Sequence, residues 1–288
     1  MPPRPRALVP LALVLALALP AGRAFAAGNS AVAALQVALQ ARLLYVGPID
    51  GMAGPDTTSA VKAFQRGRGL PADGLVGART RAALGRYGQH DLGSRPLGRG
   101  AFGWDVAELQ FLLAWHGFPS GAFDGHLGPH GVVALRLFQA YTGLPADGVA
   151  DGPTIAALRA PLPTSPIALA WPLHARIGGP FGPRGNGFHA GIDLIAPAAT
   201  PVAAAGAGRV VWAGFRPGGW GLLVTIAHRD GVRSMYAHLS RVDVRLGEAV
   251  ATGQQVGLVG ATGDATGPHL HFELRVRGAA VDPLTALR

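Results

Sequence analysis

The sequence predicts a multidomain α + β chain in which two small three-helix domains precede an antiparallel β-sheet domain. Three observations predict this fold: an internal repeat with a constant offset, a proline-rich segment after the second copy, and strand-like runs beyond Trp171. A length of 288 residues leaves room for two or more domains. The chain has no cysteine, so any metal must be held by His, Asp or Glu.

The first 26 residues have the pattern of a secretory signal peptide. Two arginines precede an apolar stretch, Ala7 to Leu19, and Ala24-Phe25-Ala26 forms an A-x-A cleavage site. The apolar stretch is shorter than the roughly 20 residues that span a bilayer, and Pro10 interrupts it. We therefore expect residues 1–26 to be removed and the protein to be exported to a periplasm, cell wall or extracellular space, without a transmembrane span.

The charge of the chain suggests an anionic partner but not a nucleic acid. Formal net charge is +9, and without the three arginines of the signal segment 22 basic residues face 16 acidic ones. A basic exported protein is attracted to anionic surfaces. No run of basic residues of the kind that binds nucleic acid is present in the sequence, so we expect no nucleic-acid partner.

The repeat consists of two copies that align without a gap, at 30–87 and 104–160. Its conserved elements are an LQ pair, an Asp-Gly turn, an FQ pair and a whole G-L-P-A-D-G segment. The paired positions are Leu35-Gln36 with Leu109-Gln110, Asp50-Gly51 with Asp124-Gly125, Phe64-Gln65 with Phe138-Gln139, and Gly69–Gly74 with Gly143–Gly148. Each pair is separated by 74 residues, which indicates a duplication.

Each copy reads as helix, loop, helix, turn and short helix. In the first copy Leu35, Leu39 and Leu43 lie at i, i+4 and i+8, which predicts one apolar helix face. In the second, Asp105 and Glu108 have the spacing of a capping box. The prolines of 161–170 predict a stiff linker to the next domain.

The repeated pattern resembles the peptidoglycan-binding domain, a non-catalytic targeting module. The resemblance rests on the LQ and FQ pairs, the Asp-Gly loop and the G-L-P-A-D-G turn, and covers about Val32 to Leu84 and Val106 to Leu158. It implies that both copies bind peptidoglycan. The alternative is a structural spacer without binding, because a fold alone does not establish a function.

The segment 171–288 predicts an antiparallel β domain. Short apolar runs alternate with glycine and Asp-Gly turns, and no long helical period intervenes. The predicted strands lie at 208–212, 222–227, 233–237, 255–259 and 271–276.

Within this domain, four imidazoles and a carboxylate stand in three short motifs. His269 and His271 lie two apart in TGPHLHFE, so on a strand they point to the same side. His189 and Asp193 lie in HAGID, and His238 follows Tyr236-Ala237. Zinc favours such ligands for hydrolysis. Iron, cobalt or manganese would also accept this nitrogen and oxygen set.

These motifs together resemble the lysostaphin/LytM-type zinc metallopeptidases, which cut peptide bonds in peptidoglycan. The resemblance spans nearly all of 171–287 and includes the FGPR motif at 181–184 and Val281-Asp282-Pro283. It implies three zinc ligands and two catalytic histidines. The implied ligands are His189, Asp193 and His271, and the implied catalytic pair is His238 and His269.

The remaining acidic residues leave one rival for the catalytic base. The chain has no HExxH motif, and Glu273 follows His271 by two residues on the same face. The resemblance implies a supporting role for Glu273 and a general base among the two histidines. Their individual roles stay open at this stage.

The sequence therefore predicts an exported, monomeric, zinc-dependent metalloendopeptidase that hydrolyses stem or cross-bridge peptides of peptidoglycan and is held there by two binding modules. The alternatives are a non-catalytic wall-binding protein or regulator of other wall hydrolases, and a general secreted protease. Turnover by the purified protein separates the first alternative from the enzyme, and cleavage of casein or elastin separates the second.

Overall fold

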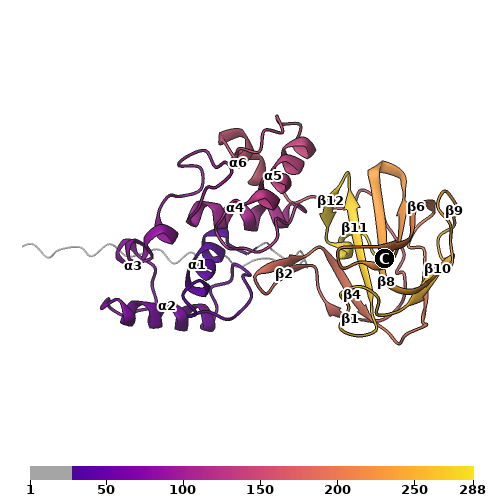
Figure 1. Ribbon diagram of the computed structural model, residues 1–288, viewed down its shortest axis with the longest axis horizontal. Helices are drawn as coiled ribbons and strands as arrows, with labels where there is room; N and C mark the ends of the chain where they lie inside the picture. The colour runs from indigo at the N-terminus through magenta and orange to yellow at the C-terminus, as the bar shows by residue number, and fades with distance from the viewer. Residues whose placement is uncertain (1–27) are drawn as a thin grey trace, which may run out of the picture.

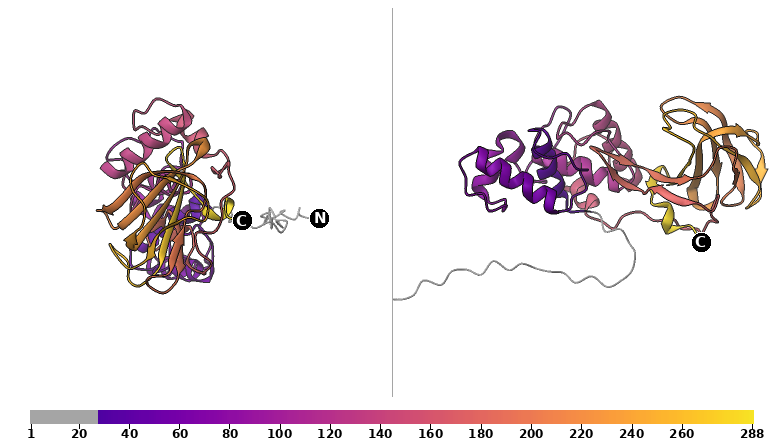
Figure 2. Two further views of the ribbon diagram at one scale, coloured as in Figure 1. Left: turned by 90° about the vertical axis from the view of Figure 1, so that its right-hand side faces the viewer. Right: turned by 90° about the horizontal axis from the view of Figure 1, so that it is seen from below.

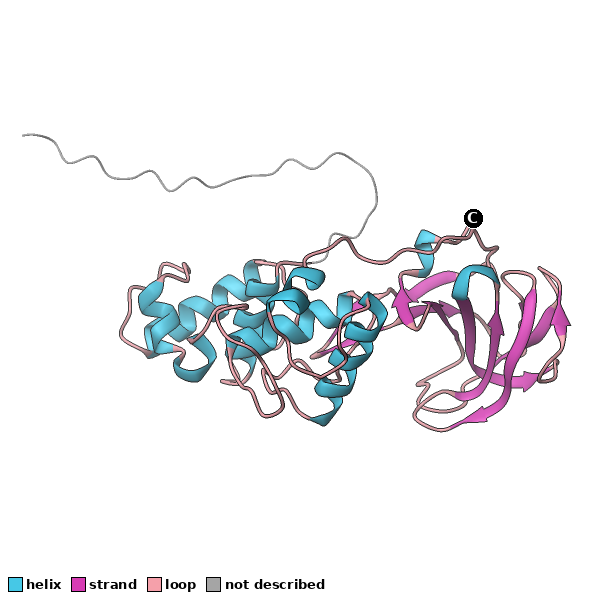
Figure 3. Cartoon of the chain, turned by 90° about the horizontal axis from the view of Figure 1, so that it is seen from above, coloured by secondary structure: helices cyan, strands magenta, loops and turns pink. Residues whose placement is uncertain are grey.

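The computed structural model describes residues 28–288, so the signal segment expected at 1–26 lies outside the described residues. Helices make up the N-terminal part of the described chain and strands the C-terminal part (Figure 1). The two kinds of structure gather at opposite ends of the molecule (Figure 3). Within residues 28–288, no helix has both the length and the apolar character needed to cross a membrane.

Each copy of the repeat forms three α-helices, in the order that the sequence predicts. Loops join them, and the first helices of the two copies, α1 and α4, pack against each other. The helices are α1 (Ser30–Gln40), α2 (Pro55–Gly67) and α3 (Ala78–Ala83) in the first copy, and α4 (Trp104–Trp115), α5 (Pro129–Thr142) and α6 (Gly152–Leu158) in the second.

Four buried glutamines explain why the repeat conserves its LQ, FQ and Asp-Gly pairs. Each amide nitrogen donates to the aspartate of an Asp-Gly turn, and each amide oxygen accepts from the backbone N–H of the glycine, at 2.7 to 2.9 Å. The glycines have φ between 72° and 81°, a conformation that other residues adopt at a cost. The sets are Gln36–Asp50–Gly51, Gln65–Asp73–Gly74, Gln110–Asp124–Gly125 and Gln139–Asp147–Gly148.

The helix face expected to run from Leu35 to Leu43 is wrong at its C-terminal end. Helix α1 ends at Gln40, and Leu43 is 90% exposed with a φ of 58°. The backbone N–H of Leu44 donates to the Leu39 carbonyl, which closes the helix with a left-handed residue. Leu43 therefore belongs to the cap of the helix rather than to its apolar face.

The capping box expected from Asp105 and Glu108 is also wrong. Gly103 is the N-cap of α4, and both carboxylates lie inside the helix. Asp105 pairs with Arg95 at 2.8 Å, and Glu108 accepts from the indole of Trp104 at 2.7 Å. A capping box needs a side chain at the N-cap that bonds the backbone N–H three residues on, whereas Asp105 lies two residues past the N-cap and its Oδ1 accepts from the N–H of Val106.

The C-terminal domain is a highly twisted antiparallel sheet, as predicted. Its main path runs β1–β4–β11–β8–β7–β6–β9, with β10, β5 and β12 attached to it, and β2 and β3 form a separate hairpin. The strands are β1 (Arg176–Gly179), β2 (Gly182–Arg184), β3 (Gly187–His189), β4 (Gly191–Ile195), β5 (Pro201–Ala203), β6 (Gly208–Arg216), β7 (Gly221–Ala227), β8 (Val232–Val242), β9 (Ala249–Val250), β10 (Gln255–Val259), β11 (Leu270–Val276) and β12 (Ala279–Val281).

The β2–β3 hairpin lies between the β domain and both helical repeats (Figures 1 and 2). At its tip, the Gly185 carbonyl accepts from the Ile49 N–H of the first repeat at 2.8 Å. The next carbonyl, that of Asn186, accepts from the Phe123 N–H of the second repeat at 2.6 Å. Both repeats therefore hold one short hairpin of the C-terminal domain.

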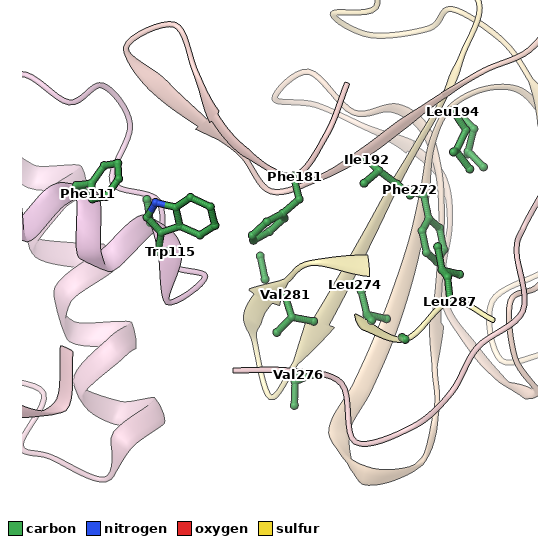
Figure 4. Close-up of a cluster of buried hydrophobic side chains, with 14 of the residues drawn as sticks. Phe111, Trp115, Phe181, Ile192, Leu194, Phe272, Leu274, Val276, Val281 and Leu287 are labelled. Atoms are coloured by element: carbon green, nitrogen blue, oxygen red, sulfur yellow. The ribbon is translucent and has the colours of Figure 1, made fainter. Parts of the chain in front are cut away.

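An aromatic cluster fills the base of this junction. The ring of Trp115, at the end of α4, packs edge-on against Phe181 and Phe188, with centroid distances of 6.2 and 5.4 Å. Trp115 faces Phe181 across the junction in Figure 4. Only 6% of Trp115 and 8% of Phe181 are exposed. One apolar core thus continues from the second repeat into the β domain.

A second contact joins the loop after α4 to β12. The N–H of Ala280 donates to the Gly117 carbonyl at 3.1 Å. Gly117 has a φ of 88°, and a Cβ placed there would collide with the Ala280 backbone. This position therefore requires glycine both for its conformation and for the close approach of the two domains.

Candidate active site

Three strands bring His189, Asp193 and His271 together. His189 ends β3, Asp193 lies in β4, and His271 lies directly opposite Asp193 in the β4–β11 pairing. The β2–β3 hairpin turns the side chain of His189 onto the same site. One ligand atom from each residue lies within 4.8 Å of the other two, and among residues 28–288 this is the single such group of three or more potential metal-binding side chains.

The atoms that face one another are two nitrogens and one oxygen. Asp193 Oδ1 lies 3.1 Å from His189 Nε2 and 3.0 Å from His271 Nδ1. The two nitrogens are 3.0 Å apart. His189 and Asp193 are buried, and His271 is partly buried. This donor set, two imidazoles and a carboxylate converging from a stiff sheet, is suited to a divalent metal with an open coordination position.

Neighbouring groups orient the site. His189 Nδ1 lies 2.8 Å from the Pro180 carbonyl, which accepts a hydrogen bond from the Nδ1–H group and leaves Nε2 free as a ligand. Arg184 donates to Asp193 Oδ2 at 2.7 Å, so the other carboxylate oxygen turns toward the imidazoles. Burial alone would raise the pKa of Asp193, but hydrogen bonds with His189, His271 and Arg184 outweigh burial and hold that pKa well below its usual range.

Glu273 lies on the opposite side of the His271 ring from Asp193. Its Oε2 is 3.6 Å from His271 Nε2, and its Oε1 pairs with Arg275. Only 1% of Glu273 is exposed. Burial lowers the pKa of His271, whereas its contacts with Asp193 and Glu273 raise it, and the net shift is upward.

His238 and His269 form a second pair beside the three ligand residues. Their ring centroids are 4.8 Å apart, and the His238 ring is 5.8 Å from that of His271. The Nδ1 of each lies 2.8 Å from a backbone carbonyl, Thr262 for His238 and Gly267 for His269. With Nδ1 protonated, the His238 ring keeps an unprotonated Nε2 that can accept a proton.

An irregularity in β8 places His238. The residue has a φ of 61°, and the register of β8 shifts against β7 between Tyr236 and Leu239 and against β10 just beyond, between Leu239 and Arg241. Such bulges re-aim side chains near active sites. Burial lowers the pKa of His238, which favours the neutral imidazole near pH 7.

The structure thus brings together all five site residues that the sequence indicates. It also adds two that sequence reasoning left without a role. Arg184, in the FGPR motif, holds Asp193, and Trp220 packs edge-on against His271 at 5.7 Å while its carbonyl accepts from the His238 N–H. Their positions in FGPR and in a Gly-Gly-Trp-Gly turn were the available signals.

The chain is similar to known families over both of its parts. The model of peptidase family M23 matches residues 187–283, which contain the five site residues. The model of the peptidoglycan binding domain matches residues 28–84 and 103–158, which contain the two helical repeats.

Curated relatives match the C-terminal part. DD-carboxypeptidase/endopeptidase Mpg of Neisseria meningitidis is 43% identical over 119 residues, covering 39% of this chain and 27% of the relative. Peptidoglycan DD-endopeptidase ShyA of Vibrio cholerae is 44% identical over 98 residues, covering 34% of this chain and 23% of the relative. These matches span about a quarter of the length of either relative.

Among solved structures, the catalytic domain of lysostaphin from Staphylococcus simulans is 35% identical, covering 38% of this chain and 90% of that chain, with a TM-score of 0.37. The sequence matches, taken with the five convergent side chains, identify the C-terminal part. The chain contains a domain of peptidase family M23, and two peptidoglycan binding domains precede it.

Proposed function

We propose that the chain is an exported zinc metalloendopeptidase that hydrolyses peptide bonds in peptidoglycan, in the stem or the cross-bridge. The observation that carries this proposal is the convergence of three potential ligands beside two further imidazoles. Its membership of a peptidase family supports hydrolysis, and the two binding domains support peptidoglycan as the substrate. We further propose that the protein acts as a monomer.

The residues fit a zinc ion. Under this proposal His189 Nε2, Asp193 Oδ1 and His271 Nδ1 hold the metal, because each of these atoms faces the other two and is oriented by a partner on its far side. Bound zinc supplies Lewis acidity, polarising a carbonyl and lowering the pKa of water. Three protein ligands are typical of a catalytic zinc rather than a structural one.

The two remaining imidazoles divide the proton transfers. We assign the general base to His238, because burial keeps its pKa low and its Nε2 unprotonated. His269 then binds the oxyanion or donates a proton to the leaving amine. Hydrogen bonds from Nδ1 to the Thr262 and Gly267 carbonyls hold both rings in orientation.

Glu273 has a positioning role in this scheme. Its carboxylate pairs with Arg275 and contacts the Nε2 of His271, the nitrogen that faces away from the other ligands. A base must reach the attacking water within hydrogen-bond distance. Glu273 instead orients the ring of His271 and favours protonation at Nε2.

The two repeats would keep the enzyme on its polymeric substrate. Tethering a catalytic domain to a binding module raises the local substrate concentration without adding contacts at the active site. The binding domains and the peptidase domain share a continuous apolar core, so they present their surfaces in a fixed relation.

The decisive experiment is mass spectrometry of the muropeptides released from purified peptidoglycan by wild type and by His269→Ala. New peptide termini produced by wild type alone, lost with a chelator and restored by zinc, are the expected result and identify the scissile bond. Casein serves as the control substrate for a general protease. If zinc-loaded wild type releases no more than His269→Ala, the chain is a non-catalytic wall-binding protein or a regulator of other hydrolases.

A further inference from the structure

A groove lies between the second repeat and the β11–β12 hairpin of the peptidase domain. Its volume is about 810 Å³, within the range of about 300–1,000 Å³ that is typical of ligand sites. The loop after α4 forms one side, α5 forms another, and the hairpin with Arg275 and Arg277 closes it. None of the five residues of the metal site lines it, so it is a separate site.

The floor of the groove is apolar and partly exposed. Val133 and Leu137, one turn apart on α5, are 56% and 55% exposed, although large aliphatic side chains are usually buried. Ala134 and Ala140 line the groove beside them. This surface suits a ligand with small aliphatic groups.

Two arginines supply the charge at the hairpin. Arg275 is engaged with Glu273 and with the Gly278 carbonyl. Arg277 is exposed, and its guanidinium lies over the ring of Tyr141, 4.8 Å from the centroid. Stacking fixes the plane of a guanidinium while its edge N–H groups stay available for a carboxylate. Arg277 is therefore presented as an anion-binding group.

A buried hydroxyl without a partner provides an independent sign of a ligand. Ser120 lines the groove and is 7% exposed, and its Oγ makes no hydrogen bond within the described part of the chain. A buried polar atom left unpaired costs stability. A ligand that hydrogen-bonds this hydroxyl would remove that cost.

The turn that carries Arg277 is strained in a way that points to function. Arg277 and Gly278 have φ of 50° and 98°, the conformation of a two-residue hairpin turn that favours asparagine or glycine first. An arginine in the left-handed region is less stable there than asparagine. Arg277 therefore occupies a position whose left-handed backbone conformation favours asparagine or glycine.

We propose that this groove binds a peptidoglycan stem peptide, with its terminal carboxylate on Arg277 and its alanine methyls on the α5 surface. The inference rests on the proposed wall-binding role and locates one site for it. A peptide fits better than a glycan, because the face of Tyr141 is covered by Arg277 and the remaining floor is aliphatic. The first repeat has no counterpart, since Val46 stands where Ser120 does in the second.

The test is a binding titration of the full chain with the tetrapeptide L-Ala–γ-D-Glu–L-Lys–D-Ala and with its C-terminal amide. Every protein carries His269→Ala, so that turnover does not enter the measurement. Arg277→Asn removes the guanidinium but suits the turn, which protects folding. Arg245→Gln is the matched control, since Arg245 is an exposed arginine outside the groove.

We expect Arg277→Asn to weaken binding of the acid about tenfold, the effect of one lost charged hydrogen bond, and Arg245→Gln to leave it unchanged. Amidation should weaken binding to the Arg245→Gln protein by a similar factor but have little effect on Arg277→Asn, because the two changes remove one interaction. Ser120→Ala should weaken binding without lowering the Tm.

Equal affinities of Arg277→Asn and Arg245→Gln for the tetrapeptide would overturn the proposal, as would binding of an N-acetylated disaccharide in place of the peptide. Muropeptide release by wild type is measured separately and requires no binding result. If Arg277→Asn does not weaken tetrapeptide binding but wild type still releases muropeptides, only this inference is rejected. If wild type releases no muropeptides, the proposed catalytic function is rejected.

Discussion

Trp115 links the second repeat to the metal site, so Trp115→Ala should weaken zinc binding although the residue lies in the other domain. Its ring packs against Phe181 and Phe188, and Phe188 immediately precedes the ligand His189 in β3. Removing the indole leaves the base of the β2–β3 hairpin without its packing partner. The ligand on that hairpin then loses part of its preorganisation.

The magnitude follows from the contacts. A buried Trp→Ala change costs about 3–5 kcal/mol of folding stability. The two edge-on ring contacts to the hairpin account for about 0.5–1.5 kcal/mol each beyond the buried area. Coupling of about 1–3 kcal/mol corresponds to a 5- to 150-fold change in affinity. We expect the zinc Kd to rise by about tenfold, which is the lower end of the effect of losing a group that directly orients a metal ligand.

The assay is zinc competition against a chromophoric chelator, with full-length protein below its unfolding transition. Phe138→Ala is the matched control, because Phe138 is fully buried in the second repeat but belongs to a separate core cluster. It should lower the Tm comparably and leave zinc affinity unchanged. Trp115→Phe should restore most of the affinity, and it also removes an indole N–H that has no partner among residues 28–288.

Equal zinc affinity of wild type and Trp115→Ala would refute this reasoning, since it would show that the β domain alone fixes His189. A loss of affinity in Phe138→Ala as large as that in Trp115→Ala would also refute it. General loosening of the second repeat, rather than the aromatic contact, would then be the cause.

Three further outcomes are expected. Chelation of the metal should lower the Tm in a thermal melt, because zinc at a thousand times its Kd stabilises the fold by about 4 kcal/mol, and an unchanged Tm contradicts binding at His189. Burial lowers the pKa of His116 below the ordinary 6.5, so the unfolded chain binds the proton more readily, and the free energy of unfolding falls as pH drops below 6.5. His116→Gln should therefore flatten the dependence of Tm on pH between pH 5 and 7. Equal slopes for wild type and His116→Gln would contradict this. Gln110→Leu should lower the free energy of unfolding by about 1–3 kcal/mol, because it leaves the Gly125 N–H without its acceptor. Denaturant titration measures this free energy, and an unchanged unfolding midpoint would contradict the prediction.

The sequence predicted the fold where local pattern and packing agree. The duplicated LQ and FQ pairs predicted the helical repeats, because a buried glutamine and an Asp-Gly turn make the same hydrogen bonds in each. It failed at Leu43, where an apolar residue at helical spacing lies beyond the end of the helix. Periodicity carries no information about the left-handed residue that ends a helix.

The sequence indicated the site residues because each stands in a motif, but it did not indicate the contacts that hold their side chains in place. Arg184 holds Asp193 from a hairpin, and the bulge at His238 depends on the pairing of β8 with two other strands. The contact of both repeats with the β2–β3 hairpin is a tertiary property, since Ile49 and Gly185 are far apart in the chain. No spacing rule encodes such contacts.

The two copies of the repeat are no longer interchangeable, although they align without a gap. Leu43 and Gly117 occupy equivalent positions and share a left-handed backbone, yet Leu43 projects into solvent and Gly117 is pressed against Ala280. A polar substitution is tolerated at the first position and excluded at the second. The loop after α1 is therefore free to vary in sequence at this position, whereas the loop after α4 is constrained by the peptidase domain beside it.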